Sequence, residues 1–318
     1  MKILAYLFLF FLLLSASCRQ QDYPRLLAVA DSLMDTRPDS AWQVLRGISS
    51  TELNRDADRA YYALLLTQVR DKNFIEQKND SLIRVAVEYY ERHEDVVMQA
   101  RAYYLWGGFY RDKNLQADAV EKYLKAAYLA EKAGCRLLLG RIYNNIGYLY
   151  YWQKLYDDAY PYFQQTAQLG ITLNDTNLYA EALLMQGKIR LNQNDYVPAE
   201  RKLLLAQSIM GNKVQIDLQI NIVRTLSLLY SRTKDKTKAL QYAKHNIGLQ
   251  TDTLHCYYAY LTLGEAYFQT GQYDSAAYYI HKSLGTSDYG IKADAYMRLA
   301  DIARQQGNVP LSLEMEIL

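Results

Sequence analysis

The chain has 318 residues, half of them hydrophobic, and its formal net charge is +2. This near-neutral balance argues against a protein that binds nucleic acid through charge alone. Length by itself allows two domains, but the repeating pattern described below favours one elongated domain.

The first residues are typical of an exported protein. A short basic start precedes the apolar run 3–14, and small residues then lead to Cys18. The run is shorter than the roughly 20 residues that a membrane-spanning helix needs, so residues 1–17 are predicted to be a signal peptide. Small residues directly before a cysteine resemble the bacterial lipoprotein signal, although Ser15 stands where leucine is commoner. The alternative is an ordinary signal peptide followed by an incidental cysteine.

The resemblance to lipoproteins implies cleavage before Cys18 and attachment of lipid to that residue. Residues 18–22 are then a lipidated tether, and an anchor with more than one acyl chain holds durably in a membrane. The pair Arg19-Gln20 lacks the aspartate that resembles an inner-membrane retention signal. We therefore expect an exported protein, lipid-anchored to the bacterial cell envelope, with the outer membrane favoured.

A short helical pair is predicted next. Residues 25–34 have helical periodicity, and Pro38 stands at a second helix start with Asp39 and Ser40 in its first turn. Stacked repeat proteins need atypical terminal units that cap the stack. We therefore predict that residues 23–54 form an N-terminal capping pair.

The remainder, residues 55–318, repeats a unit of two helices. A small residue in the first helix recurs in steps of 40, 40, 40 and 37 residues: Gly107, Gly147, Gly187, Ser227 and Gly264. A second small residue recurs with the same steps: Ala119, Ala159, Ala199, Ala239 and Ala276. Small residues let two helices approach closely, and one such unit cannot bury its apolar face without neighbours.

These columns resemble the tetratricopeptide repeat, whose signature is W-x2-L-G-x2-Y followed by A-x3-F. The match is Tyr143-x2-Ile146-Gly147-x2-Tyr150 with Ala159-x3-Phe163, and similar units surround Gly107 and Gly264. The period of about 40 is longer than the family's period of about 34. The resemblance implies an all-α fold, a right-handed α-solenoid of stacked antiparallel helix pairs.

Two regions depart from the regular pattern. In the divergent repeat over residues 57–92, the sequence Arg70-Asp71-Lys72-Asn73 recurs 41 residues later, and residues 74–80 hold about three more residues than the matching turn. Near the end, residues 294–307 predict another first helix, and residues 310–318 begin a partner helix that stays incomplete. We expect either a short C-terminal cap or a shortened version of a longer protein.

The resemblance also implies a binding surface. Ligands of the family lie along the concave surface that the first helices line, and several of the 31 tyrosines are expected there. Arginine and tyrosine suit a peptide with acidic or C-terminal carboxylate groups, although the family's carboxylate-clamp set is incomplete in this chain. The groove positions carried over by register are Arg101, Tyr104, Arg111, Arg141, Asn144, Tyr148, Tyr151, Lys188, Arg224 and Tyr258.

No catalytic or metal-binding motif is present in the sequence. The four histidines do not form H-E-x-x-H, and there is no glycine-rich phosphate loop or nucleophile elbow. Cys135 and Cys256 lie three repeats apart, so both are predicted to be unpaired thiols. We expect no enzyme activity, cofactor, metal or nucleic-acid partner.

Two functions are compatible with the sequence. The first is a lipid-anchored scaffold that binds another protein or peptide in its concave groove and the membrane through Cys18. The second is the sensor or regulatory domain of a longer signal-transduction protein.

Overall fold

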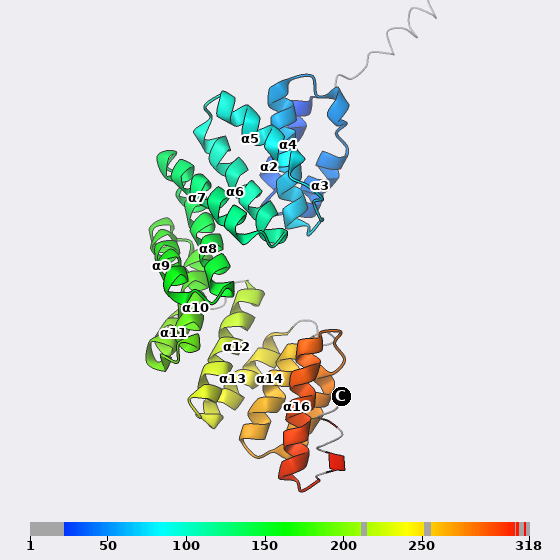
Figure 1. The fold of residues 1–318 in the computed structure, drawn as a ribbon, viewed down its shortest axis with the longest axis vertical. Coiled ribbons are helices and arrows are strands. Elements are labelled where there is room, and N and C mark those ends of the chain that lie inside the picture. Colours follow the sequence, from blue (N-terminus) through cyan, green and yellow to red (C-terminus); the bar gives the residue numbers. More distant parts are fainter. Residues whose placement is uncertain (1–21, 211–214, 251–255, 309, 312–314, 316–318) are drawn as a thin grey trace, which may run out of the picture. The chain divides into compact units, whose positions relative to one another are not determined.

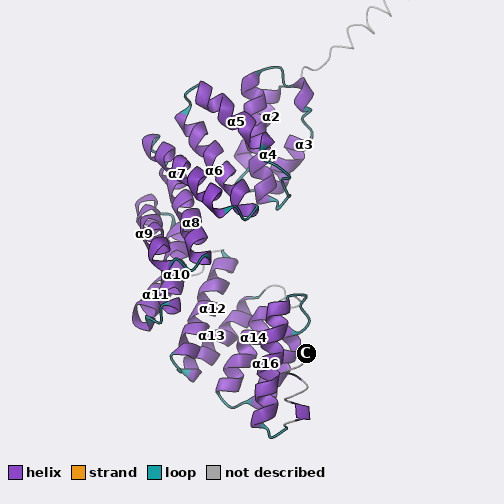
Figure 2. Ribbon diagram, viewed as in Figure 1, coloured by secondary structure: helices purple, strands orange, loops and turns teal. Residues whose placement is uncertain are grey.

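The computed structural model describes residues 22–210, 215–250, 256–308, 310, 311 and 315. In these residues it contains fifteen α-helices, one 3-10 helix and no strand (Figure 2). The predicted all-α class is therefore confirmed. The predicted signal peptide and Cys18 lie outside the described residues, as does most of the predicted partner helix 310–318.

The chain divides into two compact units, which are described separately. Unit 1 ends at Cys135 and unit 2 begins at Arg136. Unit 1 contains the following helices (Figure 1): α2 (Tyr23–Leu33), α3 (Pro38–Arg46), η1 (Ser50–Glu52), α4 (Asp56–Lys72), α5 (Ser81–Arg92), α6 (Val96–Asp112) and α7 (Gln116–Lys132). The predicted capping pair corresponds to α2 and α3, and Pro38 occupies the first turn of α3.

Unit 2 continues the alternation of first and second helices. Its elements are α8 (Arg136–Trp152), α9 (Tyr156–Leu173), α10 (Thr176–Asn192), α11 (Tyr196–Met210), α12 (Ile216–Arg232), α13 (Lys236–Leu249), α14 (Tyr257–Gln269), α15 (Tyr273–Ser283) and α16 (Tyr289–Gln305). The last first helix thus begins five residues before the predicted Asp294. Gly307 follows it with a left-handed φ of 77°.

Within each unit, the first helices form a layer of their own. In unit 1, α2 contacts α4 and α4 contacts α6; in unit 2, α8, α10, α12, α14 and α16 contact one another in that order. The second helices of the described units make no comparable contacts with each other. The first helices are therefore closer to one another than the second helices are. We refer to the surface that the first helices form together as the inner face of each unit.

The small residues of the first helices act as predicted. A Cβ atom on Gly147 would lie 2.8 Å from the ring of Phe163, and one on Gly107 would lie 2.6 Å from the ring of Tyr123. Ser227 fits because its hydroxyl donates a 3.0 Å hydrogen bond to the carbonyl of Ala239. The pairs α6–α7 and α8–α9 therefore each pack an aromatic ring against a position that has no room for a larger residue.

The turn after α4 corrects one expectation. Ile75 N donates to the carbonyl of Arg70 at 2.9 Å, as Leu115 N donates to Tyr110, so Phe74 rather than Asn73 is equivalent to Asn114. The two turns are therefore equivalent at an offset of 40 residues, one fewer than the 41 at which the four-residue sequence recurs. The loop between α4 and α5 has eight residues, 73–80, where the loop between α6 and α7 has three. The predicted excess of about three residues was too small.

Two further features concern the whole described chain. Neither Cys135 nor Cys256 is part of a disulfide among the described residues. No helix in the described ranges combines the length and the apolar character that crossing a bilayer requires.

Candidate functional site

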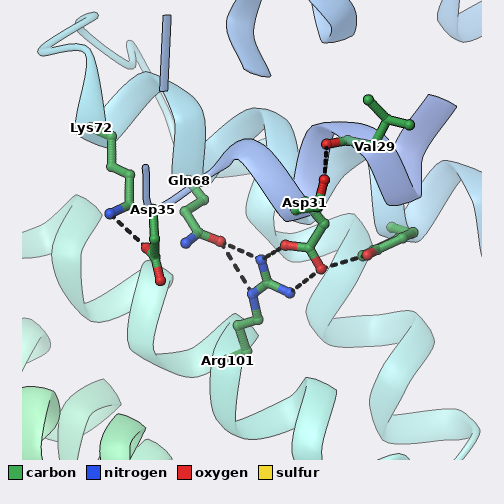
Figure 3. A network of polar contacts seen from close by, with 8 residues as sticks. Val29, Asp31, Asp35, Gln68, Lys72 and Arg101 are labelled. Atoms are coloured by element: carbon green, nitrogen blue, oxygen red, sulfur yellow. Dashed lines mark hydrogen bonds and ion pairs between the residues drawn. The ribbon is translucent and has the colours of Figure 1, made fainter. Parts of the chain in front are cut away.

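In unit 1, the predicted site residue Arg101 is occupied by internal contacts. Its guanidinium, on α6, forms an ion pair with Asp31 of α2 and donates to the side-chain oxygen of Gln68 on α4 (Figure 3). The hydroxyl of Tyr61 donates to the same carboxylate at 2.6 Å. One arginine therefore ties together the three first helices of this unit.

The electrostatics of this network show how firmly the pair is held. Burial raises the pKa of the Asp31 carboxyl, but the hydrogen bonds and charge of Arg101 outweigh burial and leave that pKa below its usual value. The ionised carboxylate is thus the form that the fold favours. A guanidinium engaged in this way has little left to offer a ligand.

The other two predicted residues of unit 1 are also engaged. Arg111 donates to Asp71 at 2.9 Å and to Asp112 at 2.8 Å. Burial raises the pKa of Asp71 despite the positive charge of Arg111 beside it. The ring of Tyr104 packs against the fully buried Tyr123, with 5.8 Å between centroids. All three predicted residues of unit 1 therefore hold the unit together.

In unit 2, by contrast, the structure brings predicted residues together around an open groove. Tyr151, Lys188, Arg224 and Tyr258 come from α8, α10, α12 and α14, and they line one groove of about 330 Å³. Lys188 also lines an adjoining groove of about 410 Å³, together with Tyr148. We refer to these two adjoining spaces as the Lys188 groove.

The described chain places no carboxylate within ion-pair distance of the two cations of the Lys188 groove. Burial, and then the charge of Arg224, lower the pKa of the Lys188 ammonium to about 8, although the negative charge of Glu181 acts on Lys188 in the opposite direction and raises that pKa. The Arg224 guanidinium donates to the amide oxygen of Asn221 and lies over the ring of Tyr258, 4.9 Å from its centroid. Neither contact neutralises the charge of Arg224, so the two cations form a positive site without an ion pair, which an anion can enter.

Aromatic and polar side chains fix the walls of the groove. The hydroxyl of Tyr148 donates to Glu181 at 3.0 Å, and the hydroxyl of Tyr151 accepts from the Asn192 amide at 3.1 Å. The rings of Tyr148 and Trp152 lie 5.5 Å apart. These contacts hold the tyrosine rings in place, so the groove is formed before any partner arrives.

The groove also has acidic residues, and they are distributed unevenly. Glu265, near Tyr258, is paired with Arg298 at 2.8 Å. Glu181 and Asp217 lie in the adjoining space on the Tyr148 side. The groove therefore has a positive end at Lys188 and Arg224 and a negative end at Glu181 and Asp217. An extended segment with an acidic and a basic group could meet both.

Two predicted residues remain at the margin of this site. The side chain of Asn144 is buried, and its Oδ1 atom has no hydrogen-bond partner among the described residues. Arg141 is half-exposed on the same helix, and neither residue lines the Lys188 groove. Glu181 was missed, although it stands 40 residues after Arg141 and the register could have found it. Asn192 stands outside the columns that were carried over.

The arrangement suits binding rather than reaction chemistry. It offers fixed rings, hydroxyl and amide groups, and two cations, with no nucleophile paired to a base. No cluster of metal-ligating side chains occurs in the part of the chain that the structure describes. Cations beside aromatic rings recognise carboxylates and phosphates in proteins.

Comparisons with known proteins agree with this fold. Residues 139–169, in α8 and α9, match the family model described as tetratricopeptide repeat. No curated protein sequence matches the chain.

Several solved structures are similar to this chain. The apo form of RapI has 13% identity and a TM-score of 0.73 over 92% of this chain and 95% of that one. The Rap protein complexed with Competence and Sporulation Factor has 13% identity and a TM-score of 0.62 over 93% and 96%. A signal transduction ATPase with a tetratricopeptide repeat sensor, from Pyrococcus horikoshii, has 14% identity and a TM-score of 0.71 over 93% and 48%. The predicted α-solenoid of tetratricopeptide repeat type is therefore confirmed.

Proposed function

We propose that this chain is a non-enzymatic repeat scaffold that binds a protein or peptide partner in the Lys188 groove. Lys188 and Arg224 receive a carboxylate of the partner, and the tyrosine rings pack against the neighbouring residues. The observation that carries this proposal is the pair of cations that the described chain leaves without an ion pair. A partly buried charge without an ion pair costs stability, so the presence of these two cations is best explained by a ligand.

The similar structures support a protein or peptide as the partner class. The Rap protein was solved in complex with Competence and Sporulation Factor, and the fold of this chain matches it over nearly its whole length. Tetratricopeptide repeats stack into extended surfaces suited to binding. The chemistry at Lys188 then adds the expectation of an acidic group.

Attachment to the cell envelope is a second part of the proposal. It is supported by the apolar run 3–14 and the small residues before Cys18. Metabolic labelling with an alkyne-bearing fatty acid tests it: the full chain should take up label, and Cys18→Ser should not. Equal labelling of both chains would rule out Cys18 as the lipid site.

A sensor role in a longer signalling protein is the alternative. It is supported by the similarity to the Pyrococcus horikoshii ATPase, in which a tetratricopeptide repeat sensor is part of a longer chain. Sequencing the gene beyond the codon for Leu318 separates this alternative from a stand-alone scaffold. An in-frame effector domain would establish it.

The groove is tested with the purified full chain and an array of eight-residue peptides. Each peptide containing Glu, with no apolar residue next to that Glu, is matched with the same peptide containing Gln. We expect the Glu peptides to bind at least tenfold more tightly, since a charge-assisted hydrogen bond contributes about 1.5–3 kcal/mol. Lys188→Gln and Arg224→Gln should remove that preference.

The matched control is Arg201→Gln, which removes an exposed cation from the second helix α11. It should bind Glu peptides like the unaltered chain. If the array shows no preference for Glu, or if the control loses the preference equally, the proposed groove is wrong.

A further inference from the structure

A second surface, in unit 1, has features that neither backbone preference nor packing explains. Turns of this chain end a helix with a left-handed residue, usually at intervals of 20. In unit 1 these left-handed residues are Phe74, Glu94, Asn114 and Gly134, and in unit 2 they include Lys154, Asn174, Asn194 and Lys234. Phe74, with a φ of 54°, is the one apolar member of this set in the described residues.

Phe74 is also 97% exposed. A bulky side chain in the left-handed region is conformationally unfavourable, whereas glycine and asparagine are tolerated there. A phenylalanine that gains no burial in the fold has no structural reason to stand at this position. Large exposed aromatic side chains are enriched where proteins bind partners.

The loop 73–80 that carries Phe74 forms one wall of a pocket. The pocket has a volume of about 380 Å³, and its apolar surface comes from Phe74, Ile75 and Phe109. We refer to it as the loop pocket. It lies wholly within unit 1 and is separate from the Lys188 groove.

The charges around the loop pocket leave one cation without a partner. Arg111 is paired with Asp71 and Asp112, and Lys113 is paired with Glu76 at 2.9 Å. Arg70 has no carboxylate within ion-pair distance in the described chain, and its buried Nε atom has no hydrogen-bond acceptor there. Arg70 is half-exposed and lines the pocket, so its positive charge can meet a carboxylate there.

We propose that the loop pocket is a docking site for a protein segment in which an apolar side chain stands next to a carboxylate. The apolar side chain packs on Phe74, Ile75 and Phe109, and Arg70 binds the carboxylate. Charge complementarity selects this occupant, because Arg70 is the pocket's uncompensated cation. Arginine and aromatic residues at the edge of a pocket are the usual anchors of such interfaces.

The test uses the full chain carrying Lys188→Gln and Arg224→Gln, which removes the cations of the Lys188 groove. It is mixed with two sets of acetylated, amidated octapeptides, one with a Leu-Glu pair and one with Leu-Gln. We expect Leu-Glu peptides to bind at least fivefold more tightly. Phe74→Asn and Arg70→Gln should abolish that difference. Phe74→Asn keeps the left-handed turn and should unfold at the same or a higher temperature, so that lost binding does not come from lost structure.

Matched controls are Tyr128→Ser, which removes an aromatic side chain 62% exposed on α7, and Arg84→Gln, which removes an exposed cation on α5. Both should retain the preference. All of these measurements are made in the background without Lys188 and Arg224, because the loop pocket does not depend on the groove of unit 2. If the preference survives Arg70→Gln in this background, the loop pocket is wrong. Equal binding of both peptide sets would overturn the proposal too.

Discussion

The inner faces of the two units use cations in opposite ways. In unit 1, Arg111 reaches Asp71, which stands 40 residues earlier, at the same position of the preceding first helix. In unit 2, the residues 40 positions before Lys188 and Arg224 are Tyr148 and Leu184. The same repeat geometry therefore creates an internal ion pair in one unit and an open positive site in the other. Partners at the preceding helix, rather than the cation itself, decide between structure and binding.

The largest change in the free energy of unfolding is expected when the paired cation of unit 1 is removed. Arg101→Met leaves the Asp31 carboxylate partly buried without its ion pair. Breaking a buried pair on one side costs about 3–5 kcal/mol, and the partial exposure of this pair lowers the expectation to about 2–4 kcal/mol. Urea unfolding of the full chain measures it.

Two controls decide whether the effect comes from the pair. Combined with Asp31→Asn, the Arg101→Met change should cost less than the sum of the single changes. Because the pKa of Asp31 is lowered in the fold, its stabilising contribution is present above about pH 4 and is lost as pH falls through the folded pKa. The gap between the unaltered chain and Arg101→Met should therefore close on acidification. Strict additivity with Asp31→Asn would contradict the comparison between the units.

Removal of the unpaired cation of unit 2 should change the free energy of unfolding in the opposite direction. Lys188→Met removes a half-buried ammonium and keeps most of the side-chain volume, so it should stabilise the fold by about 2 kcal/mol at pH 7. The folded pKa is lowered to about 8, so the penalty of the charge is complete below pH 8 and disappears as pH rises toward the unfolded value. The advantage of the variant should shrink over the same interval. Destabilisation at pH 7 would show that Lys188 has a structural partner.

A smaller effect should be equal in both units. Gly107→Ala and Gly147→Ala each place a methyl group against an aromatic ring, at 2.6 and 2.8 Å. Overpacking of this kind costs 1–3 kcal/mol, and the better helix propensity of alanine offsets part of it, which leaves about 1–2 kcal/mol. Thermal unfolding measures both variants, with the exposed Gly248→Ala as the control because no atom lies within 4 Å of its Cβ position. A gain in stability at Gly147 would mean that the helices are not in close contact there.

Binding at the Lys188 groove should depend on pH. Only the protonated ammonium attracts a carboxylate, so affinity for Glu peptides should fall as pH rises above about 8, by up to tenfold per pH unit. Lys188→Gln should bind weakly with a flat profile between pH 7 and 9. A flat profile in the unaltered chain would show that Arg224 alone carries the charge.

The fold was largely predictable because helix packing constrains few positions strongly. The columns at Gly147 and Ala159 exist because two backbones approach there, and such steric needs are visible in sequence. The pairing of Arg101 was not predictable in the same way, because Asp31 lies 70 residues away in an irregular capping pair. Register found Tyr151, Lys188, Arg224 and Tyr258, since periodicity places side chains on a face. The register does not show which of the charged side chains have a neighbour of opposite charge.

The smallest expected effect is at Phe74, where a change in stability can be measured separately from a change in peptide binding. Phe74→Asn replaces a bulky left-handed residue by one that tolerates that conformation, and it should stabilise unit 1 by about 1 kcal/mol. Nothing is lost from the core, because the side chain is 97% exposed. Asn114→Phe, the reverse change in the equivalent turn of the same unit, should destabilise it by a similar amount. Urea unfolding of the two variants measures both.

If Phe74→Asn proves less stable than the unaltered chain, Phe74 supports the loop 73–80 and its exposure is not evidence of a partner. If stability rises while the Leu-Glu preference disappears, unit 1 keeps an unfavourable residue for binding, as unit 2 keeps an unpaired lysine.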